Sequence, residues 1–467
     1  MSPNSANASP FHLWSYLGYT VLLVTGVGAF LLIRAYGETL SAPAPAAVVE
    51  AKSDVKVDVF HILLALATVI AAGQGLARVF KYIGQPPVIG EVAAGILLGP
   101  TLLGRLSPEA YHFLLPESVA PYLEAIAQLG VILYMFLVGL ELNASLSGER
   151  AHATVAISHA SILCPFVLGS ILALWLYPRL SSSDVPFTSF ALFMGVAMSV
   201  TAFPVLARIL TDRKLTQTQL GATALMCAAV DDVTAWCLLA LVVGVVQARV
   251  DGLGLVFLGT AAFVAFLFLA VRPAVVWLTV RFDRGRLSTG VIALVFMGLL
   301  LSALATEAIG IHALFGAFLF GAVIPHDSTV AREFTRRMSD VVTIFLLPAF
   351  FALTGMRTLI DFNLEYGLLC GLITVTATAG KFGGTFGAAR WTGLSWRTST
   401  SLGLLMNTRG LMELIVLNVG LQLRVISPTL FAMMVLMALV TTMATTPLLQ
   451  LLELSQPGAP VKEVEAA

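Results

Sequence analysis

The strongest constraint on this chain is a series of apolar runs, each roughly 20 residues long, that recurs from near the N-terminus to near the C-terminus. A hydrocarbon layer about 30 Å thick requires spanning helices of about this length. Charged residues make up 11% of the sequence, against roughly 25% in a typical soluble domain, and the mean hydropathy is +0.92. The sequence therefore predicts an all-α polytopic membrane protein. The formal net charge of zero argues against a nucleic-acid partner.

The apolar runs predict fourteen spans, of which the first is an extra N-terminal helix. Residues 1–56 are expected to form that helix and a linker, 57–453 the membrane domain, and 454–467 a short cytoplasmic tail. A cleaved signal peptide is the alternative for the first run, although no lysine or arginine precedes it. The spans are expected near residues 14–34, 59–80, 86–103, 121–142, 155–178, 188–211, 218–247, 254–280, 288–308, 311–326, 335–356, 364–390, 396–420 and 427–453.

The placement of basic residues predicts the orientation in the membrane. With the N-terminus in the cytoplasm, fifteen of the 26 Lys and Arg residues fall on the cytoplasmic side and eight on the outside. The other three, Arg272, Lys381 and Arg409, lie at membrane depth. We therefore expect a multi-pass protein of the inner (plasma) membrane with both termini in the cytoplasm.

Two adjacent aspartates, Asp231 and Asp232, lie near the middle of the seventh span. A charged side chain at this depth costs about 2.5–3.5 kcal/mol on insertion scales, so its presence requires an explanation. Adjacent residues point roughly 100° apart around a helix, so one carboxylate can pair structurally while the other lines a watery cavity. Carboxylate oxygens suit an alkali cation, and burial favours the protonated form, so such a site can hold a cation or a proton. A buried aspartate that caps a neighbouring helix is the structural alternative.

Lys381 is the only lysine within a predicted span and lies too deep to reach the membrane surface easily. It needs an acidic partner, for which Asp231 is the obvious candidate, or it supports the end of a broken helix. The histidines and cysteines show no metal-ligand spacing, so we expect no cofactor apart from the transported ions.

Two spans contain breaks in the helical pattern. In the sixth, Thr201 and Pro204 interrupt an apolar run, and in the thirteenth Asn407 and Arg409 do the same. Broken helices in matching halves point to a transporter site, because their ends offer dipoles and carbonyls to ions. Spans five to seven and twelve to fourteen are then predicted to form an inverted repeat. Glu413, four residues after Arg409, is expected to pair with it and to support the broken helix.

These residues resemble the monovalent cation:proton antiporters of the second superfamily branch, which includes NapA-type and Kef-type transporters. The resemblance covers about residues 57–453. It rests on these segments: Gln85-Pro86-Pro87-Val88-Ile89-Gly90-Glu91, Gly95-Ile96-Leu97-Leu98-Gly99-Pro100, Thr201-Ala202-Phe203-Pro204-Val205-Leu206, Asp231-Asp232, Gly380-Lys381, and Asn407-Thr408-Arg409-Gly410 with Glu413-Leu414.

The resemblance implies a NhaA-like fold of thirteen core helices with crossed broken helices, a homodimer, and elevator-like alternating access. It implies that Asp232 carries the ion, that Asp231 pairs with Lys381, and that Thr201 helps to bind Na⁺ or K⁺. It further implies electrogenic exchange, with more protons than cations moved per cycle. Na⁺ is the favoured cation, but the residues do not separate Na⁺, K⁺ and Li⁺.

Two other functions are alternatives to cation/proton exchange. A Kef-like regulated K⁺ efflux pathway commonly has glutamine at the first aspartate and a nucleotide-binding tail, and neither is expected here. An intramembrane aspartyl protease needs two carboxylates that face each other from separate elements. Adjacent carboxylates on one helix do not meet that requirement, so we expect a secondary transporter and not an enzyme.

Overall fold

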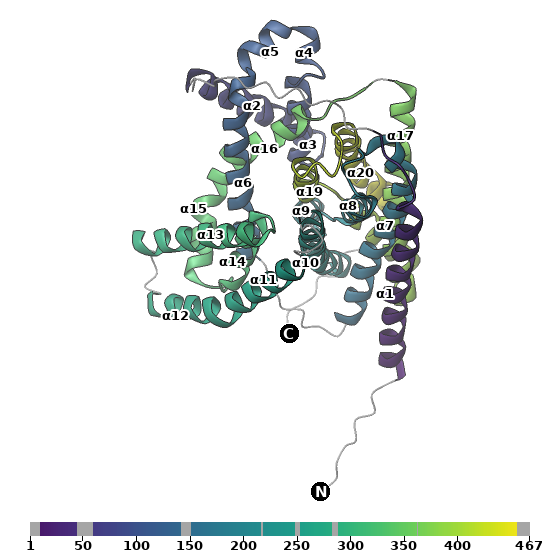
Figure 1. Cartoon of the computed structure of the whole chain (residues 1–467). Helices are drawn as coiled ribbons and strands as arrows, with labels where there is room; N and C mark the ends of the chain where they lie inside the picture. Colours follow the sequence, from purple (N-terminus) through teal and green to yellow (C-terminus); the bar gives the residue numbers. More distant parts are fainter. Residues whose placement is uncertain are drawn as a thin grey trace.

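The computed structural model describes residues 10–43, 59–141, 151–215, 218–247, 253–282, 288–361 and 363–454 (Figure 1). Within these ranges every regular element is a helix, which confirms the predicted all-α membrane fold. Most of the predicted linker, beyond residue 43, and the predicted tail beyond residue 454 lie outside the described residues.

The described residues form the following helices, given in chain order. They are α1 (Pro10–Gly37), α2 (Val59–Tyr82), α3 (Pro87–Leu98), α4 (Leu103–Leu106), α5 (Pro108–Leu114), η1 (Glu117–Val119), α6 (Ala120–Glu141), α7 (Ala151–Leu180), α8 (Phe187–Ser199), α9 (Phe203–Asp212), α10 (Gln219–Gln247), α11 (Leu253–Phe266), η2 (Leu267–Val271), α12 (Arg272–Phe282), α13 (Thr289–Ile309), α14 (Ala313–Val323), α15 (Thr329–Asp340), η3 (Val341–Leu346), α16 (Leu347–Met356), α17 (Leu364–Trp391), α18 (Trp396–Met406), α19 (Leu411–Gln422) and α20 (Pro428–Leu454).

The predicted spans all coincide with helical segments, but they are not all full crossings. Eleven helical segments of the described chain are long and apolar enough to cross a membrane, or twelve with the bent pair α18 and α19. The predicted span 311–326 contains only the 11-residue helix α14, which is about half the required length. The turn at Gly310, with φ of 95°, and Pro325 confine α14 to this length.

The helices pack into two bundles (Figure 1). The α6 bundle contains α2–α6 and α11–α16, and the α10 bundle contains α1, α7–α10 and α17–α20. Both predicted broken spans belong to the α10 bundle, as does the helix that carries the aspartate pair. In each half of the α10 bundle a broken helix lies between two long helices along the chain, which is the pattern that the predicted inverted repeat requires.

Close contact between α3 and α16 depends on two glycines that face each other. A Cβ atom at Gly355 would lie 2.2 Å from the carbonyl oxygen of Val92, and one at Gly95 would lie 2.2 Å from that of Ala352. Because these contacts are with backbone atoms, no side-chain rotation relieves them. The two helices therefore pack at a separation that only glycine permits at these positions.

Gly355→Ala is expected to lower protein stability by about 1–3 kcal/mol, because the added methyl group must push α3 and α16 apart. The measurement is the midpoint of thermal unfolding in detergent. Gly371→Ala in α17 is the matched control, since a Cβ atom there meets open space. Alanine favours helix over glycine by about 1 kcal/mol, so this control should melt at the same or a higher temperature. Equal melting of both variants would contradict the packing argument.

Candidate functional site

The centre of the α10 bundle is a crossing of two interrupted helices. α8 ends at Ser199 and α9 begins at Phe203, while α18 ends at Met406 and α19 begins at Leu411. The two interruptions are joined directly, because the backbone N–H of Ala202 donates to the carbonyl oxygen of Thr408 at 3.0 Å. The crossing therefore brings nonhelical backbone from both halves of the bundle together.

The residues at the breaks explain why the helices stop there. Pro204 lies in the first turn of α9, where its missing N–H leaves no intrahelical bond unmade. Asn407 follows the last residue of α18. A Cβ atom at Gly410 would lie 2.7 Å from Cγ2 of Val205, so a glycine lets the second break pass close to the first.

Two buried cations hold the end of α8. Arg409 donates to the carbonyl oxygens of Met198 at 2.8 Å and Ala197 at 3.2 Å, and Lys381 donates to that of Ser199 at 2.6 Å. The last carbonyls of a helix lack intrahelical partners and form the negative end of its dipole, so cations stabilise them. Both side chains thereby offset the cost of breaking a helix inside the bundle.

Arg409 also has the acidic partner predicted for it. Its guanidinium lies 3.1 Å from the carboxylate of Glu413, and both side chains are fully buried. Thr442 of α20 fixes the backbone of Arg409, since its hydroxyl accepts from the Arg409 N–H at 2.8 Å and donates to the Arg409 carbonyl at 2.6 Å. These contacts support the start of α19.

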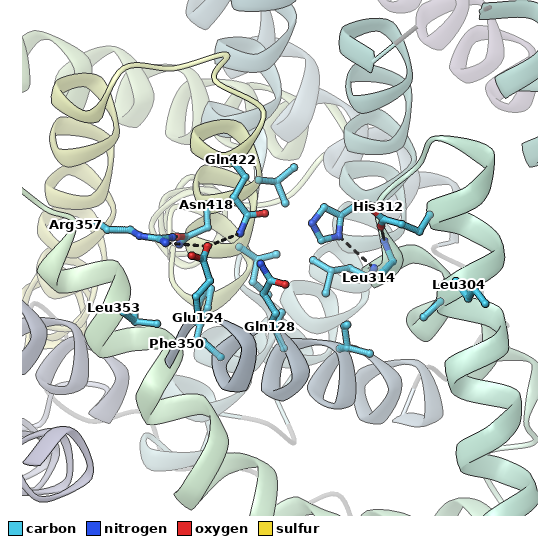
Figure 2. Close-up of a pocket in the computed structure, with 18 residues that line it drawn as sticks. Glu124, Gln128, Leu304, His312, Leu314, Phe350, Leu353, Arg357, Asn418 and Gln422 are labelled. Atoms are coloured by element: carbon cyan, nitrogen blue, oxygen red, sulfur yellow. Dashed lines mark hydrogen bonds and ion pairs between the residues drawn. The ribbon is translucent and has the colours of Figure 1, made fainter. Parts of the chain in front are cut away.

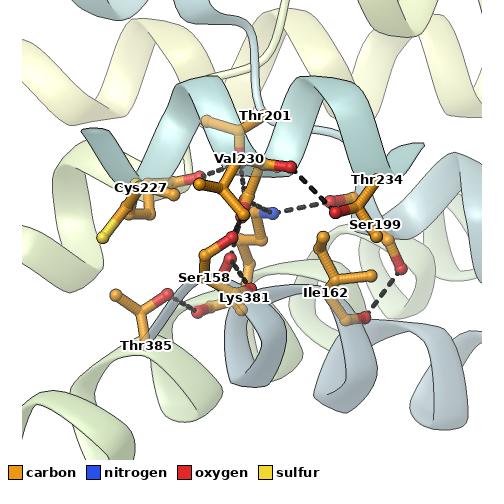
Figure 3. A network of polar contacts seen from close by, with 12 residues as sticks. Ser158, Ile162, Ser199, Thr201, Cys227, Val230, Thr234, Lys381 and Thr385 are labelled. Atoms are coloured by element: carbon orange, nitrogen blue, oxygen red, sulfur yellow. Dashed lines mark hydrogen bonds and ion pairs between the residues drawn. The ribbon is translucent and has the colours of Figure 1, made fainter. Parts of the chain in front are cut away.

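Ser158, Thr201 and Lys381 lie close together (Figure 3), and all three donate to the carboxylate of Asp231. Lys381 Nζ lies 2.9 Å from its Oδ2, and both side chains are fully buried. Oδ2 also accepts from the hydroxyls of Ser161 at 2.7 Å and Thr201 at 2.8 Å, while Oδ1 accepts from Ser158. Both oxygens of the Asp231 carboxylate therefore accept hydrogen bonds.

Asp232 differs from its neighbour in this respect. Its side chain is also buried, with 5% exposure, yet within the described residues its Oδ1 has no hydrogen-bond partner. The side-chain oxygen of Asn407 is likewise buried and unpartnered within those residues, and α10 packs against α18, which Asn407 follows. Buried polar atoms are nearly always satisfied, so these two unpartnered oxygens on adjacent elements are candidates for binding a ligand.

The hydroxyl of Thr201, predicted to help bind the ion, contacts Asp231 in this structure and lies 3.2 Å from the carbonyl oxygen of Met406. Its role as an ion ligand stays a prediction.

Sequence reasoning missed Ser158 and Ser161, both on α7. Two hydroxyls three residues apart share one face of a helix, and that spacing within an apolar run was the available signal. Thr442 carried no such signal, because it lies in a run of several threonines in α20.

A family model described as a transmembrane sodium/hydrogen exchanger matches residues 62–451. The Na(+)/H(+) antiporter NhaS4 of Synechocystis sp. is 42% identical over 406 residues, which cover 84% of this chain and 97% of that protein. The K(+)/H(+) antiporter 1 of Saccharomyces cerevisiae is 34% identical over 385 residues, covering 80% of this chain and 44% of the yeast protein.

Cation/H(+) antiporter 20 of Arabidopsis thaliana is 41% identical over 402 residues, which cover 83% of this chain. This chain spans about half the length of the plant and yeast relatives, matching 48% of that plant protein. Among solved structures, the sodium proton antiporter MjNhaP1 of Methanocaldococcus jannaschii superposes with a TM-score of 0.65 at 15% identity, covering 85% of this chain and 99% of that one. That likeness shows a shared fold. Together with the crossed helices and the buried charges, these matches show that the chain belongs to the sodium/hydrogen exchanger family.

Proposed function

We propose that this protein exchanges a monovalent cation for protons across a membrane by alternating access, with Asp232 as the group that holds either ion. The observation that carries the proposal is the contrast between the two aspartates. Asp231 is bonded to Lys381 and three hydroxyls, whereas Asp232 has an unpartnered buried oxygen within the described residues. A carboxylate oxygen that has no internal partner among the described residues is free to bind an ion that enters and leaves.

The chemistry of Asp232 makes binding of a cation and a proton mutually exclusive. In a buried setting a carboxylate must either take up a proton or gain a cationic partner, because an isolated charge is too costly there. Oxygen ligands are those that alkali and other hard cations prefer. Thr201 and Asn407 are proposed to supply further oxygens to the cation, since both belong to the crossing beside α10.

Na⁺ is the favoured cation and K⁺ the second candidate. The relative named as a Na(+)/H(+) antiporter matches over nearly its whole length, and the one named as a K(+)/H(+) antiporter matches over less than half of its own. We further propose that more protons than cations move per cycle. Each net charge moved is then driven by about 2.3 kcal/mol per 100 mV of membrane potential.

The loop charges support placing both termini in the cytoplasm of a cell whose inner (plasma) membrane holds the protein. We propose a homodimer formed through the α6 bundle. Large exposed apolar side chains on α13, including Met297, Leu300 and Leu301, give this bundle a surface that fits lipid or a second copy.

Proton flux in proteoliposomes that contain a pH-sensitive dye tests the proposal. Addition of Na⁺ or K⁺ is expected to change the internal pH, while choline is expected to leave it unchanged. A membrane potential imposed with valinomycin should alter the rate of Na⁺-driven proton flux if the exchange is electrogenic. Cation flux without proton counterflow would overturn exchange and favour the K⁺ efflux pathway.

A further inference from the structure

A cavity of about 410 Å³ lies between the two bundles (Figure 2). Its walls come from α6, α13, α14 and α16 of the α6 bundle and from α19 of the α10 bundle. Polar side chains gather on one side of this cavity, where Glu124, Arg357, Asn418 and Gln422 point toward one another. This polar group is separate from the aspartate pair, which does not line the cavity.

Hydrogen bonds in this polar group run from one bundle to the other. Asn418 of α19 donates to the hydroxyl of Thr354 on α16 at 2.9 Å and accepts from Arg357 Nη1 at 3.2 Å. Gln422, the last residue of α19, donates to Glu124 Oε1 on α6 at 3.3 Å. Asn418 and Gln422 are four residues apart, so both lie on the face of α19 that meets the α6 bundle.

Within the α6 bundle, two of the residues that contact α19 also bond to each other. Arg357 and Glu124 form an ion pair at 2.9 Å, and both belong to the α6 bundle. Asn418 also donates to the carbonyl oxygen of Leu414 in its own helix at 2.8 Å. Arg357 and Glu124 therefore keep each other as partners when the bundles separate, and Asn418 keeps the carbonyl oxygen of Leu414. The cavity has room for water to replace the hydrogen bonds that are lost between the bundles.

We propose that Asn418 and Gln422 form a latch with Thr354, Arg357 and Glu124 that holds the two bundles together in the state described here and opens once in each transport cycle. This inference rests on the proposed alternating access, which requires the bundles to move relative to each other. It adds positioning residues that do not touch the ion.

The position of the latch connects it to the ion site. α19 is a single 12-residue helix that begins beside Arg409 and Gly410 at the crossing and ends at Gln422 in the latch. A shift of the crossing therefore moves the latch residues along the same rigid element. Since single hydrogen bonds contribute little net free energy, a few of them bias the population of this state by roughly tenfold or more and still break reversibly.

Reversible cross-linking tests the latch in the full chain reconstituted in proteoliposomes. The more accessible cysteines, Cys164, Cys237 and Cys370, are first replaced by alanine, and the fully buried Cys227 is kept. Glu124→Cys with Gln422→Cys places a pair across the bundles, and a short bis-methanethiosulfonate reagent joins it. Gln128→Cys with Ile132→Cys is the matched control, because these positions lie four residues apart on α6, line the same cavity and are not latch residues.

Linking the cross-bundle pair is expected to reduce exchange at least tenfold, with recovery after dithiothreitol, while linking the control pair leaves the rate unchanged. Linked peptides are verified by mass spectrometry. The latch is overturned if the linked cross-bundle pair exchanges at its unlinked rate, or if linking the control pair blocks exchange equally. It is also overturned if no link forms although both cysteines react with a monofunctional reagent. Failure of the wild-type protein to exchange cations for protons would refute the proposed function itself.

Discussion

Replacing Asp232 by asparagine is expected to lower cation-driven proton flux at least a hundredfold while the protein stays folded. Asparagine has nearly the same shape, so the change removes the ionisable group and little else. Without it the site neither releases a proton nor neutralises a bound cation. Because the unpartnered oxygen of Asp232 makes no internal bond within the described residues, its loss should not lower the thermal unfolding temperature.

The same proteoliposome assay measures this effect, with unfolding in detergent followed in parallel. Asp327→Asn is the matched control, since it makes the same chemical change at an exposed residue between α14 and α15. That control is expected to keep wild-type flux. Wild-type flux in the Asp232→Asn protein would remove this residue from the mechanism, and a large loss of thermal stability would mean that it has a structural role instead.

The helices could be predicted from the sequence because the membrane imposes one length on every crossing segment. Where the chain departs from that length, prediction failed, as for the half-length helix α14. Hydropathy measures how apolar a run is, but not whether a turn at Gly310 cuts it short. The packing of helices within a bundle depends on tertiary contacts such as that between Gly95 and Gly355, which leave no periodic mark on the sequence.

The charged residues of the site were also visible in the sequence, because each carries a large cost in an apolar run and so needs a reason to be there. Asp231 was the expected partner of Lys381 from the residues, and the family resemblance implied the same pair. The structure brings Asp231 and Lys381 together. The hydroxyls of Ser158 and Ser161 escaped notice, because serine costs little in a membrane helix and its partner lies about 70 residues away in the sequence.

Lys381→Met is expected to destabilise the protein by about 3–5 kcal/mol, because it leaves the charge of Asp231 buried without its cationic partner. It also removes the donor to the last carbonyl of α8. Adding Asp231→Asn should restore most of that stability, since the remaining amide is neutral. Its oxygen still accepts from the hydroxyls of Ser161 and Thr201, while its NH2 group donates to the hydroxyl of Ser158. The two changes are thus expected to be strongly non-additive.

Thermal unfolding of the wild type, both single variants and the double variant measures this coupling. The double variant keeps Asp232 and is expected to exchange cations for protons faster than Lys381→Met alone, because its crossing is held closer to the native geometry. Thr374→Val is the matched control for α17, since the Thr374 hydroxyl bonds only within its own helix turn in the described chain. Additive losses of stability from the two single changes would mean that the buried pair does not hold α10 to α17. The hydrogen bonds from Lys381 and Arg409 to the last carbonyls of α8 would then stabilise the crossing.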